Sequence, residues 1–355
     1  MTSRSLPLAQ DVVDHAVHGS YCPKLCSHTC PVLDATGRTD AVPWGFHRTV
    51  ADLATDRLTP SEAAGRLVAC TGCGACAGGC KIEGQDVPAQ VRAGRAAVVA
   101  AGAGLPAVAA ATTEVAAGRS PYGVQPGSSI SATAATITLL AGCRDEARTV
   151  QDATRLLAAA GETVALVVPA GCCGAVLRDL GDTEAADAAR AAVRSELPRT
   201  GRIALLDPHC RPETEAAAPG TEVVDLVALL AELVAAGSLT ITQGPELVRW
   251  HEPCLLVDGA AAGRGPSVLA STGSLVELPG EAHRGCSGGG MGMDLLDAGA
   301  ANEVAVRRLE HVAGPGPLVT GCAGAARRFA AAGTDAHHLV THLAGLLDDE
   351  SDTVA

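Results

Sequence analysis

The loop sequence GCCG, residues 171 to 174, returns in altered form as GCSG at residues 285 to 288, and this repetition decides the fold. The other cysteines repeat with it: Cys143 precedes Cys172 by 29 positions and Cys254 precedes Cys286 by 32, while Cys210 follows Cys172 by 38 and Cys322 follows Cys286 by 36. Two copies of one ancestral unit explain these spacings better than chance. Ser287 therefore takes the position that Cys173 holds in the first copy.

Strand and helix patterns alternate around both loops. The expected strands are 136–141, 163–168, 203–207, 247–251, 275–278 and 317–320, and the expected helices are 149–160, 183–197, 221–236 and 294–312. This alternation predicts parallel sheets, with the cysteines at the ends of strands, where open α/β folds carry their sites.

The segment before the first repeat has a helical pattern. We expect helices between Cys30 and Cys70, one of them starting at Thr59-Pro60-Ser61-Glu62, and a further helix over 85–102. Residues 104–131, rich in Ala, Gly, Pro and Ser, are typical of a linker or a wrapping arm. The predicted division is 1–103, linker 104–131, 132–240 and 241–355.

The run CTGCGACAGGC, residues 70 to 80, places cysteines at intervals of two, two and three residues. This is the bacterial ferredoxin spacing, in which the first three thiolates hold three corners of a 4Fe-4S cluster and the fourth binds a neighbouring cluster. Tetrahedral zinc sites usually combine two separated Cys-x-x-Cys pairs, so the run favours iron and sulfide over zinc. Its cysteines are Cys70, Cys73, Cys76 and Cys80.

The partner run, YCPKLCSHTCP, is irregular. Cys30, followed by Pro31, can complete the cluster of Cys70, Cys73 and Cys76. Cys22, Cys26 and Cys80 then remain for a second 4Fe-4S or 3Fe-4S cluster, one thiolate short of four. His28, Ser27 or solvent could fill the vacancy, or the fourth iron or the whole cluster could be missing; spacing does not choose among these.

The only lysines of the chain lie beside these cysteines. Lys24 is inside the irregular run and Lys81 follows Cys80 directly. A cation beside an anionic cluster raises its reduction potential, so we expect both lysines to tune the clusters without binding iron.

The adjacent pair Cys172 and Cys173 forms a disulfide with itself only under strain. As thiolates the two can bind neighbouring metal ions, and Gly174 permits the tight backbone. With Cys143 and Cys210 they offer four thiolates, enough for a further iron–sulfur cluster. Buried structural cysteines or a redox-active dithiol remain alternatives.

These motifs resemble a known family, the iron–sulfur subunits with cysteine-rich CCG domains. It includes the catalytic subunit of heterodisulfide reductase and the iron–sulfur subunits of glycerol-3-phosphate, glycolate and lactate oxidation. The resemblance covers nearly the whole chain. It includes the two cysteine runs, Arg119-Ser120-Pro121-Tyr122-Gly123, GCCG, His251-Glu252-Pro253-Cys254, Cys286-Ser287-Gly288-Gly289-Gly290 and Thr320-Gly321-Cys322.

The resemblance implies an α+β multidomain chain, with an N-terminal α-helical ferredoxin domain followed by two Rossmann-like α/β CCG repeats. Members of the family pass electrons between a flavoprotein and an acceptor such as a disulfide or a quinone. In the fullest members, each repeat contributes five cysteines to a noncubane cluster pair that attacks a disulfide.

This sequence departs from the full family pattern. Asp207-Pro208-His209-Cys210 has one cysteine where the motif has two, and Ser287 and Ala325 stand where further cysteines would be. The second repeat keeps Cys254, Cys286 and Cys322 as candidate ligands. We therefore expect one cluster, held mainly by Cys143, Cys172, Cys173 and Cys210.

The chemistry is expected to centre on Cys172 and Cys173. His209 and His251, next to Asp207 and Glu252, are candidates to donate or accept protons, or else loop residues. His337, His338 and His342 are expected on a C-terminal helical segment, where a metal site is disfavoured because no carboxylate ligands lie nearby in the sequence.

Composition narrows the function further. The net charge of −13 excludes a basic nucleic-acid surface and suits an electropositive protein partner. Without an expected export signal, fourteen cysteines are better explained as metal ligands or redox thiols than as disulfides. No Gly-x-Gly-x-x-Gly fingerprint opens a βα unit and no Walker motif is present, so hydride chemistry is expected on another chain.

The expected protein is thus a cytoplasmic iron–sulfur oxidoreductase subunit, active only with a partner and peripheral to the membrane, if at all, through that partner. The expected partners are a flavoprotein dehydrogenase or electron-transfer flavoprotein and a membrane quinone reductase subunit. The alternatives are a non-enzymatic iron–sulfur carrier or redox sensor with a degenerate CCG site, and a metal-free vicinal dithiol oxidoreductase.

Overall fold

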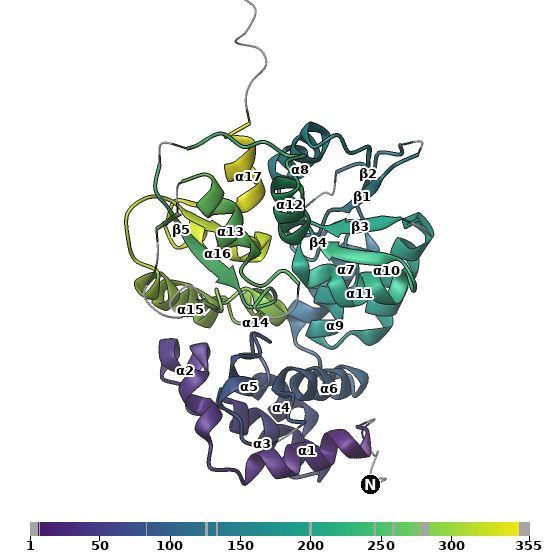
Figure 1. Cartoon of the computed structure of the whole chain (residues 1–355). Coiled ribbons are helices and arrows are strands. Elements are labelled where there is room, and N and C mark those ends of the chain that lie inside the picture. Colours follow the sequence, from purple (N-terminus) through teal and green to yellow (C-terminus); the bar gives the residue numbers. More distant parts are fainter. Residues whose placement is uncertain are drawn as a thin grey trace, which may run out of the picture.

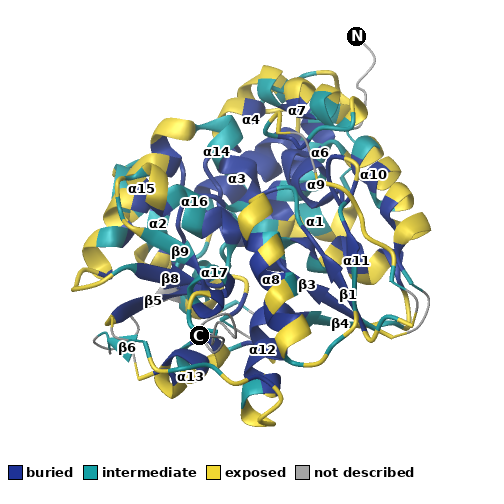
Figure 2. Cartoon of the chain, turned by 90° about the horizontal axis from the view of Figure 1, so that it is seen from above, coloured by how far each residue is buried: buried dark blue, intermediate teal, exposed yellow. Residues whose placement is uncertain are grey.

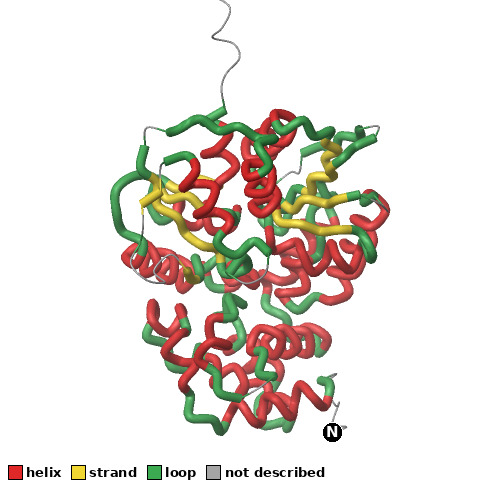
Figure 3. Tube along the Cα trace, viewed as in Figure 1, coloured by secondary structure: helices red, strands yellow, loops and turns green. Residues whose placement is uncertain are grey.

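The computed structural model describes residues 6, 8–82, 84–124, 127–132, 134–198, 201–244, 246–257, 260–273, 275–276, 278 and 284–347. The described chain has an all-helical part and two parts built on parallel sheets (Figure 1). Figure 3 shows the strands in two separate groups above the helical part. The predicted combination of helices with parallel sheets is confirmed.

The helical part begins with short helices joined by tight turns. Thr59 and Glu62 form a reciprocal capping box at one of them, which confirms the helix start predicted there. The helix Pro106–Ala116 lies inside the segment predicted as a linker. The helices are α1 (Gln10–Ser20), α2 (Pro31–Thr36), α3 (Pro43–Ala54), α4 (Pro60–Arg66), α5 (Ala75–Gly79) and α6 (Val87–Ala100), with a 3-10 turn over Leu25–Thr29. The next helix, α7 (Pro106–Ala116), packs in the core of the first repeat.

The first sheet has the strand order β2-β1-β3-β4, and all its pairs are parallel. Its strands are β1 (Ile137–Leu140), β2 (Val164–Val167), β3 (Arg202–Leu205) and β4 (Glu222–Asp225). Its helices are α8 (Ala147–Ala159), α9 (Ala175–Leu180), α10 (Thr183–Glu196), α11 (Arg211–Ala217) and α12 (Leu226–Ala235), with a 3-10 turn over Pro208–Cys210.

The long helix predicted over 221–236 is wrong in its first part. Residues 222–225 form β4, and only Leu226–Ala235 is helical. Val223 and Val224 pair with Ile203 and Ala204 of β3. β-branched residues fit a pleated sheet, and a partner strand far away in the sequence decided the conformation here.

The second sheet has the order β6-β5-β8-β9, with β7 paired to β5, so its main path repeats that of the first sheet. Its strands are β5 (Val248–Pro253), β6 (Leu275–Val276), β7 (Arg284–Gly285), β8 (Leu318–Thr320) and β9 (Ala336–His338). Its helices are α13 (Arg264–Ser271), α14 (Met293–Leu296), α15 (Ala298–His311), α16 (Ala323–Ala331) and α17 (Leu339–Ala344), with a 3-10 turn over Gly290–Gly292.

Two predictions for this part are wrong, and a third is tested only in part. The helix expected over 294–312 is broken at Asp297, whose carboxylate accepts a hydrogen bond from the Ala300 amide and caps α15. His337 and His338 belong to strand β9, and only His342 is on a helix. Residue 277 of the strand expected over 275–278 lies outside the described residues.

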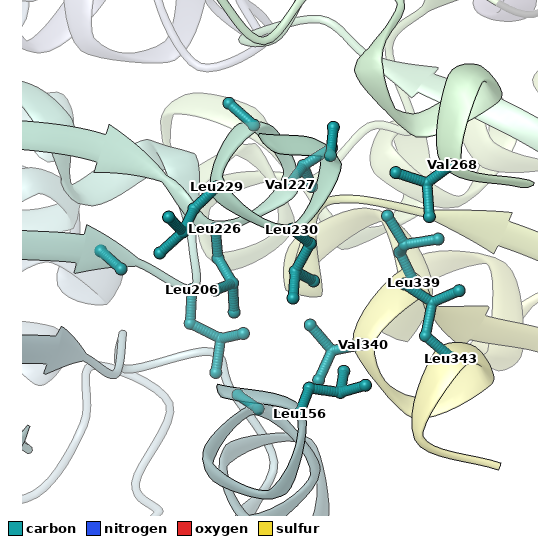
Figure 4. Packing of buried hydrophobic residues seen from close by; sticks show 14 of the residues in the cluster. Leu156, Leu206, Leu226, Val227, Leu229, Leu230, Val268, Leu339, Val340 and Leu343 are labelled. Atoms are coloured by element: carbon teal, nitrogen blue, oxygen red, sulfur yellow. The ribbon is translucent and has the colours of Figure 1, made fainter. Parts of the chain in front are cut away.

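One apolar core lies between the two sheets. Leu226, Val227 and Leu230 of α12 meet Leu156 of α8 and Leu339 of α17 there, as Figure 4 shows. Their side chains come from both repeats. The core forms where α8 and α12, which pack on the first sheet, meet α17 and α13, which pack on the second. Figure 2 shows buried residues running through the centre of the molecule and exposed ones along its outer helices.

A second core joins the helical part to the second sheet. It combines Phe46, Val50 and Leu67 with Met291 and Met293, which come from the glycine-rich stretch after Cys286. Gly290 lies so close to the helical part that a Cβ there would stand 2.0 Å from the Thr71 carbonyl oxygen. Only glycine allows this approach between the GCSGGGMGM loop and the 70–80 cysteine run.

Arg95 of α6 connects all three parts. Its guanidinium donates hydrogen bonds to the carbonyl oxygens of Leu67, Val68 and Cys70 in the helical part at 2.8 to 3.3 Å. It also donates to the backbone carbonyl oxygens of Asp179 in α9 and of Met291, both at 2.7 Å. The side chain is 5% exposed, and burial lowers its pKa from the usual arginine value.

Arg95→Lys should therefore lower the free energy of unfolding by about 3 kcal/mol or more. A lysine ammonium has three donors, so at least two buried carbonyl oxygens would lose their partner, each at a cost of about 1–3 kcal/mol. Urea denaturation followed by circular dichroism measures the change. Arg148→Lys is the control, because the Arg148 side chain is 79% exposed; equal stabilities of the two variants would contradict the role of Arg95.

Candidate functional site

Four cysteines from the two N-terminal runs line one small cavity. They are Cys30, Cys70, Cys73 and Cys76, and apolar side chains such as Phe46 and Val32 close the cavity around them. Burial raises the pKa of Cys70 to about 12. The charge of Arg95 opposes this rise, and the neighbouring thiols add to it. The predicted first set of ligands is thus brought together, from segments 40 residues apart.

The remaining cysteines of the two runs line a second small cavity. Cys22, Cys26 and Cys80 line it together with Cys76 and His47. Burial, with added repulsion from Cys22 and Cys80, raises the pKa of Cys26 to about 11. Cys76 lines both cavities, so the two sites share a wall. His28, a predicted candidate for this site, lines a different and larger cavity beside Cys30.

The third group is the predicted set at the GCCG loop. Cys143 follows β1, Cys172 and Cys173 follow β2, and Cys210 follows β3, which confirms that these thiols stand at the ends of strands. Cys143 and Cys173 are both hydrogen-bonded to Cys172, and Cys173 also to Cys210. The four sulfur atoms therefore form one connected group.

Within this group Cys172 is the most acidic position. Hydrogen bonds from the Cys143 and Cys173 thiols, opposed by burial, hold the pKa of Cys172 well below the usual value. The Gly174 amide adds a hydrogen bond at 3.3 Å. The same hydrogen bonds raise the pKa of Cys143 and Cys173. The arrangement favours one thiolate, at Cys172, held by two neutral thiols.

The second loop reproduces the backbone of the first. The Gly288 amide donates to Cys286 at 3.3 Å, as the Gly174 amide does to Cys172. Both glycines have positive φ, 105° for Gly174 and 84° for Gly288. A Cβ would stand 2.6 Å from a carbonyl oxygen at Gly174 and 2.2 Å from one at Gly288. Replacing Cys173 by Ser287 has thus left the turn intact.

The thiols of the second repeat separate in a way that the sequence did not predict. Cys286 is hydrogen-bonded to Cys254 and also to Cys73 of the ferredoxin-like run. Cys322 instead has Asp207 and Arg144, at the first loop, as its electrostatic neighbours. No spacing rule pairs Cys286 with Cys73, because their contact arises from the packing of two parts of the chain.

Arg144 and Asp207 form a buried ion pair at the first group. The guanidinium donates two hydrogen bonds to the carboxylate, at 2.7 and 2.8 Å, and a third to the Gly289 carbonyl at 3.1 Å. Burial alone would raise the pKa of Asp207, but the charge and hydrogen bonds of Arg144 lower it to about 2. The pair therefore stays charged and ties the first cysteine group to the second loop.

The predicted proton carriers are engaged in fixed contacts. His209 is 2.6 Å from the Asp179 carboxylate, which also accepts from Arg92 at 2.6 Å. His251 is buried, accepts a hydrogen bond from Arg308 at 3.4 Å and packs edge-on against Phe329. His209 therefore has a carboxylate partner with which to share a proton, whereas His251 faces a cation.

The two lysines lie on the surface near the cysteine runs. The Lys24 ammonium stands 4.0 Å from the centre of the Trp44 ring, and its backbone amide donates to Cys22. Lys81 is exposed. A cation–π contact holds the charge of Lys24 beside the second cavity, in keeping with a tuning role.

A cavity of about 660 Å³ opens between the helical part and the second sheet. Cys30, Cys73, Cys254 and Cys286 all line it, together with His28, Asp34, Arg307, Arg308 and His311. Arg307 is paired with Asp34 and Glu310. Arg308 is 7% exposed, and one terminal nitrogen of its guanidinium has no hydrogen-bond partner in the described part of the chain. Such a cavity favours an anionic ligand beside four thiols.

The described part of the chain lacks two features, a site for a single metal ion and a helix that could span a membrane. No group of three or more His, Cys, Asp and Glu side chains there is placed to hold a single metal ion. None of the described helices combines the length and the apolar character that a membrane span needs.

Comparison of the chain with protein-family models, with curated proteins and with solved structures found no match.

Arg308→Gln should reduce the preference of Cys254 and Cys286 for an anionic alkylating reagent. The Arg308 guanidinium, with its unpaired nitrogen, attracts iodoacetate but not the neutral iodoacetamide. A unit charge close to the reacting thiol changes the ratio of the two alkylation rates by about tenfold. The ratio is measured on the two cysteine peptides by mass spectrometry, in anaerobically purified protein.

Arg307→Gln is the matched control for that experiment, because Asp34 and Glu310 already balance its charge. We expect it to change the rate ratio much less. Equal effects of the two substitutions would contradict an uncompensated charge at Arg308.

His338→Asn should weaken the acid sensitivity of the fold. Burial lowers the pKa of His338 to about 4, whereas an unfolded histidine titrates near 6.5, so the unfolded chain binds the proton first and stability falls as the pH drops from ~6.5 to ~4. Asparagine keeps the cap that His338 provides to the Val340 amide. Urea denaturation at pH 7 and at pH 4.5 measures the free energy of unfolding at each pH. The loss between the two should be smaller in the variant by up to about 3 kcal/mol; an unchanged loss would rule out His338 as the cause.

Proposed function

We propose that the chain is an iron–sulfur electron-transfer subunit of a cytoplasmic oxidoreductase. In this proposal the helical part is a ferredoxin-like domain and the two sheets are Rossmann-like CCG repeats, the second of them degenerate. The observation that carries the proposal is the convergence of seven cysteines from two distant runs on two cavities that share Cys76.

The residues present fit iron–sulfur clusters. Soft thiolates are the usual ligands of such clusters, and the first cavity offers four of them behind an apolar wall. In a cluster each thiolate binds a different iron, so the ligands need not converge on one ion. Burial raises the pKa of these thiols, so they are protonated when no metal is bound. Bound iron would supply the positive charge that holds them as thiolates.

Each part of the chain has a distinct task in this proposal. Bound clusters would accept and donate single electrons. Cys30, Cys70, Cys73 and Cys76 would hold one cluster, and Cys22, Cys26 and Cys80 would hold the second. Lys24 and Lys81 would raise the potential of the second cluster. The shared wall at Cys76 keeps the distance between the two short.

Two places could serve two-electron chemistry. At the GCCG loop, Cys143, Cys172, Cys173 and Cys210 would hold a further cluster, with His209 sharing its proton with Asp179 nearby. The large cavity beside Cys254 and Cys286 gives an acceptor such as a disulfide room next to the first cluster. The strand order common to both sheets supports the repeat on which this assignment rests.

The donor of electrons would be a flavoprotein dehydrogenase or an electron-transfer flavoprotein, and the acceptor a disulfide, or a quinone reached through a membrane subunit. The acidic surface supports docking to an electropositive partner. Activity is expected only in the presence of that partner.

A metal-free dithiol oxidoreductase is the second candidate, favoured by the low pKa of Cys172. The Cys172 thiolate would attack a substrate disulfide and release one thiol. Cys143, hydrogen-bonded to Cys172, would then attack the mixed disulfide and release the second thiol. The substrate gains two electrons and two protons, and Cys143 and Cys172 end as a disulfide.

Anaerobic purification with iron and sulfide analysis and EPR separates the candidates. Three clusters predict eleven or twelve irons per chain, and Cys70→Ser should remove about four of them. Cys143→Ser should remove only the cluster at the GCCG loop. A chain free of iron in which Cys172 is readily alkylated would instead favour the dithiol enzyme.

A further inference from the structure

The cavity lined by Cys22, Cys26 and Cys80 contains a side chain that the cysteine spacing does not point to. His47 of α3 lines it together with the three thiols, and Gln85 closes another side. His47 is 3% exposed, far from the cysteine runs in the sequence, and enters through the packing of α3 against α1 and the 3-10 turn.

The orientation of the His47 ring is set by Gly19. A Cβ at Gly19 would stand 2.3 Å from Cδ2 and 2.8 Å from Nε2 of the ring, so this edge faces α1. The opposite edge carries Nδ1, which is buried and has no hydrogen-bond partner among the described residues. The lone pair or the proton on this nitrogen is therefore not used by any hydrogen bond in that part of the chain.

The Gln85 side chain also carries buried polar atoms without a partner. Within the described ranges, neither its amide oxygen nor its amide nitrogen has a hydrogen-bond partner. Leaving a polar group buried and unpaired costs about 1–3 kcal/mol. Three such atoms lie on two residues that line the same cavity as the three thiols, and they indicate a group that completes them when it is bound.

We propose that His47, through Nδ1, is the fourth ligand of the cluster held by Cys22, Cys26 and Cys80, and that Gln85 donates a hydrogen bond to it. This proposal rests on the proposed function. Three thiolates and one imidazole supply the four ligands that the sequence left incomplete, and imidazole is an accepted ligand in place of thiolate.

The other candidates match the site less well. His28 lines the larger cavity next to Cys30. Ser27 offers a hydroxyl oxygen, a harder donor than imidazole, for which iron of a sulfide cluster has little preference. His47 combines burial, a free ring nitrogen and a place in the cavity wall.

Histidine ligation would set the direction of electron flow. A neutral imidazole in place of a thiolate makes a cluster less negative and raises its reduction potential. The second cluster would then hold an electron more readily than the all-cysteine cluster on the other side of Cys76.

The test uses the full chain, purified anaerobically from cells grown with ¹⁵N-histidine or with natural histidine, and reduced. The double substitution Cys70→Ala/Cys143→Ala serves as the background, because it removes both the first cluster and the cluster at the GCCG loop and leaves the signal of the second cluster alone. Pulsed EPR should show a strong nitrogen coupling on that signal, and the coupling should change with the isotope.

Three variants make the assignment specific. His47→Ala should lose the histidine coupling, and the matched control His28→Ala should keep it. His47→Cys should keep four irons at the site, lose the coupling and have a lower reduction potential, which guards against misfolding of the alanine variant.

Each outcome decides a different point. A second cluster without histidine coupling, or iron at the first site only, overturns the role of His47 and leaves the proposed function standing. Coupling that survives His47→Ala but not His28→Ala also overturns it. A chain that binds no iron overturns both proposals.

Discussion

The buried guanidinium of Arg95 is the contact on which the arrangement of the three parts depends. It binds carbonyl oxygens just before the 70–80 cysteine run, at the end of α9 and in the GCSGGGMGM loop. Carbonyl oxygens carry no net charge, so the hydrogen bonds to the cation come from dipoles, and the charge of Asp179 adds to them. Such a cation must be fully surrounded to be buried. The three segments are therefore held at one point, and the cysteine-bearing loops next to them are held with it. Cys73 meets Cys286 because Arg95 and Gly290 bring Met291 and Thr71 together.

Buried arginines recur wherever two parts of this acidic chain meet. Arg144 joins Asp207 of the first repeat to Gly289 of the second, and Arg308 lies where the second repeat faces the helical part. Every guanidinium nitrogen of Arg95 and Arg144 donates a hydrogen bond, whereas one nitrogen of Arg308 has no partner within the described ranges. The first two serve the architecture, and the third leaves a positive charge available in the largest of the thiol-lined cavities. Ordinary interior packing would not leave it so, because an unpaired buried charge is costly.

The two repeats have kept one backbone and divided the chemistry. Gly174 and Gly288 make the same turn beneath Cys172 and Cys286, yet the thiols above them differ in their neighbours. Cys143 and Cys173, two cysteines of its own repeat, donate hydrogen bonds to Cys172 and lower its pKa. Cys286, with Ser287 beside it, turns to Cys254 and to Cys73 in the helical part. The loss of one thiol thus coincides with a new contact across the molecule.

Local patterns in the sequence determined the parallel strands, the cysteines at their ends, the capped helix at Thr59 and the grouping of Cys30 with Cys70, Cys73 and Cys76. These features follow from residues close in sequence or from a spacing that one metal cluster dictates. Tertiary structure alone decided that residues 222–225 are a strand, that Cys286 faces Cys73, and that His47 and Arg308 line thiol cavities. Each of these depends on a partner brought close by packing, and neither period nor spacing records a partner that is distant in the chain. The glycines of GCSGGGMGM illustrate both: the sequence marks a tight turn, and only the folded chain shows Thr71 as the reason that no side chain fits at Gly290.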